Sequence, residues 1–433
     1  MAVEEIKKWP ANKVEILCAD LFDFLSQQGH GLNQAELSQV SPFNCLAGSS
    51  IRGDSGCSEL DCRAAKLAWL ARYSAMYADK MFLPVPLEIP GHVEDKEILR
   101  QRLIQTVTSV LELRPLVEKG VVRPVVPVLH YCEHHAQLAL RTYREGEQTV
   151  AALAAKNANK FRFSYELLSE EPSIGALKLS GPTEYIEHGS MYRLFLRPPA
   201  WAPPSMKRGK KFNLHPHTPV HLEQVRFLFS CIARDVVFHQ QFGPQFDATY
   251  LTDLPGEAQF LQLLSKEDEL AIKTARLFAS LTHEIPLLTD LPIRTILKIR
   301  DENPQSFEAY RSTLKKIVKD HVEQSQSATE EEARDLYEDV LAPVLTQLRV
   351  EAKRQHNRWV RKSLTTAAFA VGVVSLGATG ILQSAQVMAL LGGATVKGLV
   401  DQLGEADTEP VNSSSLYFLL RLQDKAKHRR KGR

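Results

Sequence analysis

The chain has 433 residues, of which 44% are hydrophobic, so it is long enough for two to four domains with proper cores. Its 53 Lys and Arg nearly balance its 51 Asp and Glu, which excludes an overall field that would favour nucleic acid or an acidic partner. Binding driven by charge must therefore be local. The N-terminal sequence MAVEEIKKWPANK has no apolar run behind its charges and does not resemble a secretory signal. We expect a cytoplasmic protein, with peripheral association with the inner membrane as the alternative.

The chain contains six cysteines, which are widely scattered. Without a secretory signal, this distribution indicates reduced thiols and not a disulfide framework. The closest group, Cys45, Cys57 and Cys62, has spacings that match no standard zinc or iron–sulfur pattern. The sequence therefore predicts no cofactor.

The first clear patterns are helical. Residues 58–82 begin with Ser58, a good N-cap, and repeat apolar residues along one helical face. The segment MFLPVPLEIP that overlaps its end contains three prolines and predicts an extended path. Residues 96–118 predict another helix, broken at Gly120. The stretch VVRPVVPVL at 121–129 predicts a short edge strand, because its prolines cannot donate to a ladder.

The sequence HYCEHH gathers side chains that bind metals. These are His130, Cys132, His134 and His135. On a helix, the first and third would share a face. A metal site needs further ligands from elsewhere, and the HExxH order of catalytic zinc sites is missing. We expect no bound metal, and we keep a metal-dependent hydrolase or nuclease built on these four residues as an alternative.

The period of the pattern changes at residues 161–196. Polar and apolar residues alternate in FRFSYELL, GALKLSG and YRLFLRP, with turn signals between them, which predicts an antiparallel meander. Residues 201–218 have no period and are rich in proline and lysine, which predicts a surface loop or linker. The basic run MKRGKK in this segment supplies four candidates for contact with phosphate or another anion: Lys207, Arg208, Lys210 and Lys211.

The second half of the chain is expected to be all-α. After Thr218 and Pro219, an N-cap and a first helical residue, apolar residues recur at helical spacing. Further helical patterns cover residues 265–283, 292–299 and 306–324. No strand pattern returns. Thr329 and Glu332 form a capping box that opens a long helix, which Pro343 should kink.

Residues 363–396 contain no Asp, Glu, Lys, Arg or His, in a chain that is 24% charged. A helix needs about twenty apolar residues to cross a bilayer core of about 30 Å, and Thr, Ser and Gly dilute this run. If the run folds back near residues 377–380, each arm is about 22 Å long and falls short of the bilayer. Small residues at a spacing of four let two such arms pack closely. We therefore expect a helical hairpin buried in the protein.

Insertion of this run into lipid is the alternative, because basic residues flank it on both sides. The residues expected to contact a membrane or a partner are its large apolar ones: Phe369, Val373, Leu376, Ile381, Met388 and Leu390. The basic tail that closes the chain adds Arg429 and Arg430 to the candidates for anion contact.

Together these patterns predict an α+β protein that is predominantly α-helical, with a small antiparallel β-meander in the middle. Its all-α C-terminal half should end in the helical hairpin of small residues. The expected divisions are a mainly helical N-terminal domain at 1–150, the meander at 151–200, the loop at 201–218, a helical domain at 219–326, the long helix with the apolar hairpin at 327–424, and the basic tail at 425–433.

Several segments resemble those of large uncharacterised bacterial cytosolic protein families. They are RYSAMYADKMFLPVPL at 72–87, LRPLVEKGVVRP at 113–124, LPIRTILKIRDENPQSFEAYRSTL at 291–314 and LYFLLRL at 416–422. The resemblance implies a bacterial cytosolic protein and brings no functional residues with it. Neither GxxxxGK[ST] nor a GxGxxG after a strand occurs, so a P-loop or Rossmann nucleotide site is not expected.

Because the sequence shows no catalytic constellation, the favoured hypothesis is a protein that binds other macromolecules and has no enzymatic activity. Its first expected partner is another protein, in a bacterial stress or phage-defence module. Nucleic acid is the second partner class, supported by the local basic segments and not by the net charge. A membrane-acting effector that uses residues 363–396 and the metal-dependent enzyme are the alternatives.

Overall fold

The computed structural model describes residues 2–30, 43–52, 60–87, 95–126, 132–170, 173–195, 197–242, 248–264, 291–325, 330–342, 418 and 422. The chain divides into two compact units. One contains residues 1–74 and 78–268, and the other contains residues 75–77 and 269–433.

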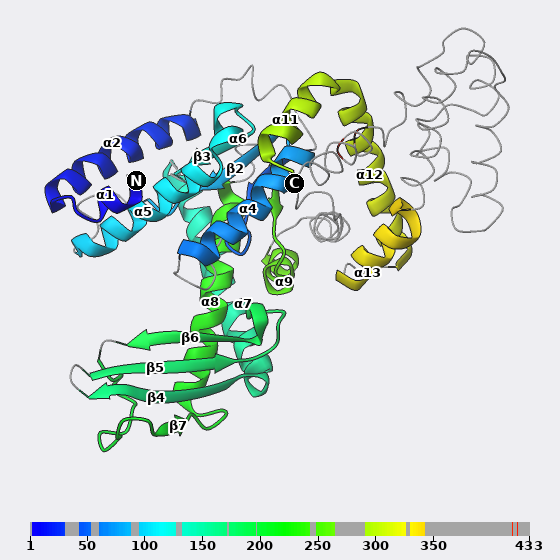
Figure 1. Cartoon of the computed structure of the whole chain (residues 1–433). Helices are drawn as coiled ribbons and strands as arrows, with labels where there is room; N and C mark the ends of the chain where they lie inside the picture. Colours follow the sequence, from blue (N-terminus) through cyan, green and yellow to red (C-terminus); the bar gives the residue numbers. More distant parts are fainter. Residues whose placement is uncertain are drawn as a thin grey trace, which may run out of the picture. The chain divides into compact units, whose positions relative to one another are not determined.

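Helices and strands alternate in the first part of the chain, and helices follow one another in the last part (Figure 1). The described helices are α1 (Ala2–Ile6), α2 (Ala11–His30), α4 (Leu60–Tyr77), α5 (Lys96–Glu112), α6 (Arg114–Glu118), α7 (Glu133–Asn157), α8 (Pro219–Phe242), α9 (Pro255–Leu264), α11 (Ile293–Glu302), α12 (Pro304–Ser325) and α13 (Glu330–Asp335). The described strands are β1 (Asn44–Ala47), β2 (Lys80–Pro84), β3 (Val122–Val125), β4 (Arg162–Glu170), β5 (Ser173–Ser180), β6 (Ser190–Phe195), β7 (Lys211–Asn213) and β8 (Thr249–Leu251).

One sheet, called sheet A here, is parallel throughout. Its strand order is β3-β2-β1-β8. Parallel neighbours need long crossover connections, and α4 links β1 to β2 while α5 and α6 link β2 to β3. β3 lies at the edge, which confirms the predicted edge strand at 121–129. The predicted fold class did not include a parallel sheet, so sheet A adds to it, and β8 corrects the prediction that no strand follows residue 218.

The two central strands of sheet A, β1 and β2, are almost wholly buried. All four residues of β1 are buried, as are four of the five in β2. Leu46 of β1 and Leu83 of β2 have no exposed surface, and α4 contributes Leu67 and Leu70 to the same core. This helix ends at Tyr77, five residues before the predicted end, because β2 begins at Lys80.

The other sheet, called sheet B, is antiparallel in the order β6-β5-β4-β7. β4, β5 and β6 confirm the predicted meander. The strand β7 forms inside the segment predicted as a loop, so that prediction is wrong for residues 211–213. Figure 1 shows the four strands side by side.

The alternation in sheet B separates a buried face from a solvent face. Phe163, Tyr165 and Leu177 point to the buried face and are at most 3% exposed. Helix α8 packs there: its His221 ring lies edge-on to Phe163, with 5.1 Å between centroids. The predicted N-cap of α8 is confirmed, since Thr218 Oγ1 accepts a hydrogen bond from the His221 N–H at 3.3 Å.

An aromatic cluster joins the sheet B region to α9 within the same unit. Phe229 of α8 contacts the rings of Phe161, Tyr185 and Phe260, with centroids 4.8 to 5.7 Å apart. The Tyr185 hydroxyl donates a hydrogen bond to Oε1 of Gln259 at 2.5 Å. Because α9 follows β8 of sheet A closely in the chain, this cluster connects sheet A with the residues that flank β4 and β5 of sheet B.

The unit that contains residues 269–433 has a helical core among its described residues. α11 and α12 confirm the helices predicted at 292–299 and 306–324. Tyr310 of α12 packs against Tyr77 and Phe418, at 5.8 and 5.5 Å between centroids. The guanidinium of Arg311 is buried beside them and donates from Nη1 to the carbonyl of Tyr77 at 3.0 Å.

Several predictions fall outside the described residues. They concern the helix at 265–283, Pro343, the uncharged run at 363–396 with its six apolar residues, and the tail with Arg429 and Arg430. Among the helices that the structure describes, none has the length and apolar character needed to cross a membrane.

Candidate functional site

The carboxyl ends of β1 and β8 form the switch point of sheet A. The chain continues from β1 towards β2 and β3 on one side, while β8 lies on the other side. In open parallel sheets, ligands bind in the crevice at such a point. Gly48 follows β1 directly, and its N–H donates to the carbonyl of Leu251 at 2.8 Å. A Cβ at this position would lie 2.7 Å from that oxygen, so only glycine fits here.

The carboxyl group of Glu257, on α9, is buried at this switch point. Its oxygens accept hydrogen bonds from the Ser49 hydroxyl at 2.5 Å, the Ser50 N–H at 3.2 Å, the Ser50 hydroxyl at 3.3 Å and the Tyr250 hydroxyl at 3.1 Å. Glu257 has no exposed surface, and both serines are 3% exposed. The loop after β1 thus binds a carboxyl group that the chain itself provides.

This arrangement argues for a structural role of the Glu257 network. Hydroxyl and N–H donors after the first strand of a parallel sheet are the groups that would otherwise hold a ligand phosphate. Here they bond to Glu257, and the Ser50 hydroxyl also lies 3.0 Å from the Thr252 hydroxyl. Because these side chains are buried and hydrogen-bonded to one another, the network joins β1 to α9. We therefore place the functional site elsewhere.

The solvent face of sheet B is the better candidate, and we call it the open face. Its residues are Arg162, Ser164 and Glu166 of β4, Lys178 and Ser180 of β5, Tyr192 and Leu194 of β6, and Lys211 and Asn213 of β7. The register places Tyr192, Lys178, Ser164 and Asn213 in one row across the four strands. Tyr192 and Leu194 are 63% and 66% exposed, which is high for large apolar side chains on a sheet.

The open face carries local positive charge. Residues 162–213 contain eight Lys and Arg against five Asp and Glu, an excess of three in 52 residues, whereas the whole chain has an excess of two. Glu166 is the acidic member of the face as defined, and Lys211 Nζ lies 4.0 Å from its Oε2. The near-neutral net charge of the whole chain therefore does not reveal this local excess of positive charge.

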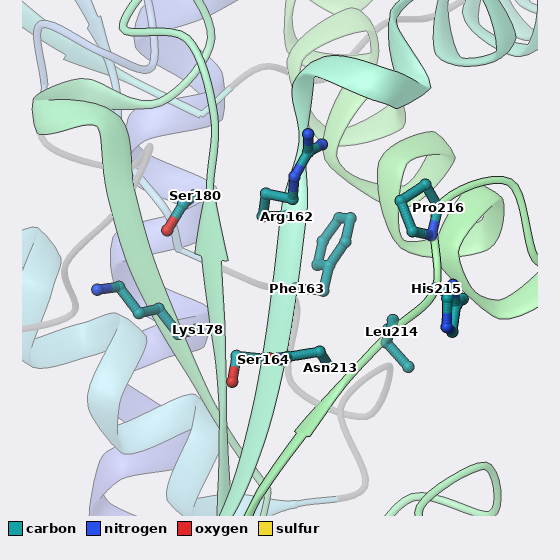
Figure 2. A pocket seen from close by; sticks show the side chains of 9 residues that line it. All are labelled: Arg162, Phe163, Ser164, Lys178, Ser180, Asn213, Leu214, His215 and Pro216. Carbon is teal, nitrogen blue, oxygen red and sulfur yellow. The ribbon is translucent and has the colours of Figure 1, made fainter.

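A pocket of about 450 Å³ lies at one end of the open face. Its lining comes from β4, β5, the end of β7 and the segment that leads into α8, as Figure 2 shows. The lining residues are Arg162, Phe163, Ser164, Lys178, Ser180, Asn213, Leu214, His215 and Pro216. Arg162 Nη1 donates to the carbonyls of Asn159 and Phe161, at 2.6 and 3.0 Å, which holds its guanidinium at the pocket.

A buried histidine lies behind the sheet at this end. His221 has no exposed surface, and its Nε2–H donates to the carbonyl of Phe161 at 3.3 Å. Burial lowers the pKa of His221, and the charges of His217 and Arg162 lower it further, while the hydrogen bond to Phe161 opposes them. The neutral imidazole is therefore the form that fits the folded protein.

The structure brings some of the sequence-predicted residues to the open face. Lys211 is a member of it, and Lys207, Arg208 and Lys210 lie in the turns that lead to β7 and are exposed. The N–H of Gly209, in the middle of this run, donates to the carbonyl of Leu167 on β4 at 3.0 Å. The basic segment is therefore tied to sheet B. Arg162, Lys178 and Tyr192 were not predicted. Arg162 and Lys178 lie in the polar phase of the alternation at 161–180, whereas Tyr192 lies in the apolar phase of YRLFLRP.

The proposed metal ligands are only partly described. His130 lies outside the described residues, as does the side chain of His135. Cys132 precedes the first turn of α7 and His134 lies within it, and both are exposed. Within the described part of the chain, no group of three or more His, Cys, Asp or Glu is placed to hold a metal ion. The metal hypothesis stays a prediction.

Comparison with known proteins identifies no relative. No protein-family model matches the chain, and no curated protein and no solved structure is significantly similar to it.

Proposed function

We propose that this protein binds single-stranded nucleic acid on the open face of sheet B. The observation that supports the proposal most directly is the row formed by Tyr192, Lys178, Ser164 and Asn213. It offers a ring for base stacking, a cation for phosphate and two polar side chains for base edges. Proteins that bind single strands combine these elements.

Single strands suit this surface better than duplexes. A duplex stacks its bases internally, so an exposed Tyr on a sheet face has no base to contact, whereas an unpaired base presents its π-face to any ring. Single strands also carry one phosphate per nucleotide, and the cations Arg162, Lys178 and Lys211 lie on neighbouring strands that are about 4.8 Å apart. This spacing distributes positive charge along the face.

The sequence analysis expects a protein that binds macromolecules, with another protein as its first partner. The proposal keeps this role but makes nucleic acid the partner. A protein partner would be favoured by a large apolar patch, whereas the open face combines two exposed apolar side chains, Tyr192 and Leu194, with Lys and Arg. A role in a bacterial defence or stress module is compatible with nucleic-acid binding and forms part of the proposal as its biological setting.

Fluorescence anisotropy with labelled oligonucleotides of about 20 residues tests the proposal. We expect single-stranded RNA or DNA to bind more tightly than a duplex of the same sequence, and affinity to fall by at least about tenfold between about 50 and 200 mM salt. Replacing Arg162, Lys178 and Lys211 together by Ala should abolish most of the binding.

The matched control replaces three exposed lysines that belong to the helices α5, α11 and α12 and not to sheet B, namely Lys96, Lys298 and Lys319. It changes the net charge by the same amount and should leave affinity nearly unchanged. Equal losses in both triple variants would show that binding follows net charge alone. Equal affinity for duplex and single strand would also reject the proposal.

A further inference from the structure

The pocket at the end of the open face has the composition of an anion site. Arg162 and Lys178 bring positive charge to it, and Ser164, Ser180 and Asn213 bring hydroxyl and amide groups. Among the described residues that line it, none is acidic. An anion that enters the pocket therefore meets donors from three strands and no opposing carboxylate.

The segment before α8 adds to this character. His215 and Pro216 line the pocket, and α8 begins three residues later at Pro219. The N-terminus of a helix carries partial positive charge, and α8 is 24 residues long, so its dipole is fully developed. The basic side chains and the N-terminal end of the helix thus both favour the binding of an anion.

The pocket is larger than a phosphate ion needs. Its volume of about 450 Å³ lies in the range of sites that hold small organic ligands, about 300 to 1,000 Å³. The exposed Pro216 supplies apolar surface beside the polar groups. A ligand with an anionic group and a flat organic part matches this division, and a nucleotide has both.

The pocket also marks an end of the face. Asn213, Leu214, His215 and Pro216 form a continuous stretch of chain along one side of it, as Figure 2 shows. The row from Tyr192 to Asn213 ends at this stretch, because β7 is the edge strand of sheet B. The last nucleotide of a strand is therefore the one best placed in the pocket.

We infer that the pocket binds the phosphorylated end of a nucleic-acid strand. A terminal phosphomonoester carries between one and two negative charges near pH 7, with a second pKa of about 6, whereas an internal phosphodiester carries one. Arg162 and Lys178 both line the pocket and supply two positive charges to it. This inference rests on the proposed binding of single strands to the open face and specifies which part of the strand the pocket takes.

Three oligonucleotides of one sequence test the inference: one with a 5′-phosphate, one with a 3′-phosphate and one with hydroxyls at both ends. Binding is measured by competition against a labelled unphosphorylated strand. We expect one phosphorylated end to bind at least about tenfold more tightly than the unphosphorylated strand, as charge-assisted hydrogen bonds to the additional charge predict. The other phosphorylated strand should bind like the unphosphorylated one.

Two variants locate the effect. Arg162→Ala should reduce the preference for the phosphorylated end to less than about twofold, while Tyr192→Ala should weaken all three strands by a similar factor and leave the preference intact. Arg162→Lys keeps a cation and should retain part of the preference. Circular dichroism checks that Arg162→Ala is folded, which is expected because this side chain is exposed.

The outcomes separate the two proposals. Equal affinity for all three oligonucleotides overturns the inference and leaves single-strand binding standing. A preference that survives Arg162→Ala also overturns it, because the phosphate is then recognised elsewhere. Binding of none of the three contradicts the proposed function itself. Competition by inorganic phosphate alone, with no preference among the strands, identifies a general anion site and rejects the end-binding role.

Discussion

Lys178 and Tyr192 lie opposite each other on β5 and β6, with the Lys178 ammonium 5.8 Å from the centre of the Tyr192 ring. The pair presents a cation and an aromatic face at one point of the open face. A cation near a ring is attracted by its quadrupole, so the ammonium helps to hold the ring in place. A base that stacks on Tyr192 would therefore bring its phosphate close to Lys178.

Tyr192→Ala should weaken single-strand binding by about 5- to 150-fold, which corresponds to the loss of one stacking contact of about 1–3 kcal/mol. Tyr192→Phe keeps the ring and should bind nearly as well as the original protein. Tyr143, an exposed tyrosine of α7, provides the control Tyr143→Ala. Anisotropy titrations at fixed salt measure all three. A loss in Tyr192→Phe as large as in Tyr192→Ala would show that the hydroxyl matters and not stacking.

Lys178→Ala should change the salt dependence of binding. Each phosphate neutralised on a single strand contributes about 0.7 to the slope of log affinity against log salt. Removing this cation should lower the magnitude of the slope by about that amount, whereas Tyr192→Ala should leave the slope unchanged. Titrations at four salt concentrations give the slopes. The assignment of Lys178 as a phosphate contact is wrong if the two variants have the same slope as the original protein.

The Glu257 network should matter for stability. Glu257→Ala leaves the Ser49 hydroxyl, the Ser50 N–H and the Tyr250 hydroxyl without their common acceptor in a buried place. Each buried donor that loses its partner costs about 1–3 kcal/mol, and the Ser49 hydroxyl and the Ser50 N–H both lose theirs, so we expect the free energy of unfolding to fall by at least about 2 kcal/mol. Urea unfolding followed by circular dichroism measures it. The control Glu118→Ala removes an exposed carboxylate paired with Arg114 and should cost less than about 1 kcal/mol.

The sequence predicts sheet B well and sheet A poorly, for a physical reason. Alternation at 161–180 arises because one face of sheet B is buried and the other is solvated, so β4 and β5 carry a readable period. The strands of sheet A are three to five residues long, and the central strands β1 and β2 are almost wholly buried, so they have no readable period. β1 also pairs with β8, about two hundred residues later, and no local pattern encodes such a pairing.

The open face was predictable only in part. The basic run at 207–211 is visible as a cluster in the sequence, and the structure attaches it to sheet B through β7. Arg162, Lys178 and Tyr192 are separated by 14 or more residues in the sequence, and they come together only through the register of β4, β5 and β6. A meander prediction supplies the strands but not their register, so it cannot place these three side chains in neighbouring positions.

Arg311 should contribute to the helical core by filling volume. Its side chain is 1% exposed, and its guanidinium lies 4.4 Å from the centre of the Phe307 ring and pairs with Glu308. Glu308 is 58% exposed, so it stays hydrated when its partner is removed. Arg311→Met should cost about 1–3 kcal/mol for the lost hydrogen bond to Tyr77, and Arg311→Ala more, because it also leaves a cavity. Urea unfolding compares them with Arg294→Ala, an exposed control on α11.

His221 should make the stability depend on pH. Its pKa is lowered in the folded protein, so the unfolded chain binds a proton there more readily than the folded chain does. The resulting stability is complete above the ordinary histidine pKa of about 6.5 and is lost as the pH falls towards the lower, folded-state pKa. His221→Gln keeps an N–H donor for the carbonyl of Phe161 and removes the titrating group. Its melting temperature should therefore fall less than that of the original protein between about pH 7 and 5. The exposed His134 provides the control His134→Gln, which should follow the original protein. If the melting temperatures of all three proteins fall equally as the pH is lowered, His221 does not cause the loss of stability in acid.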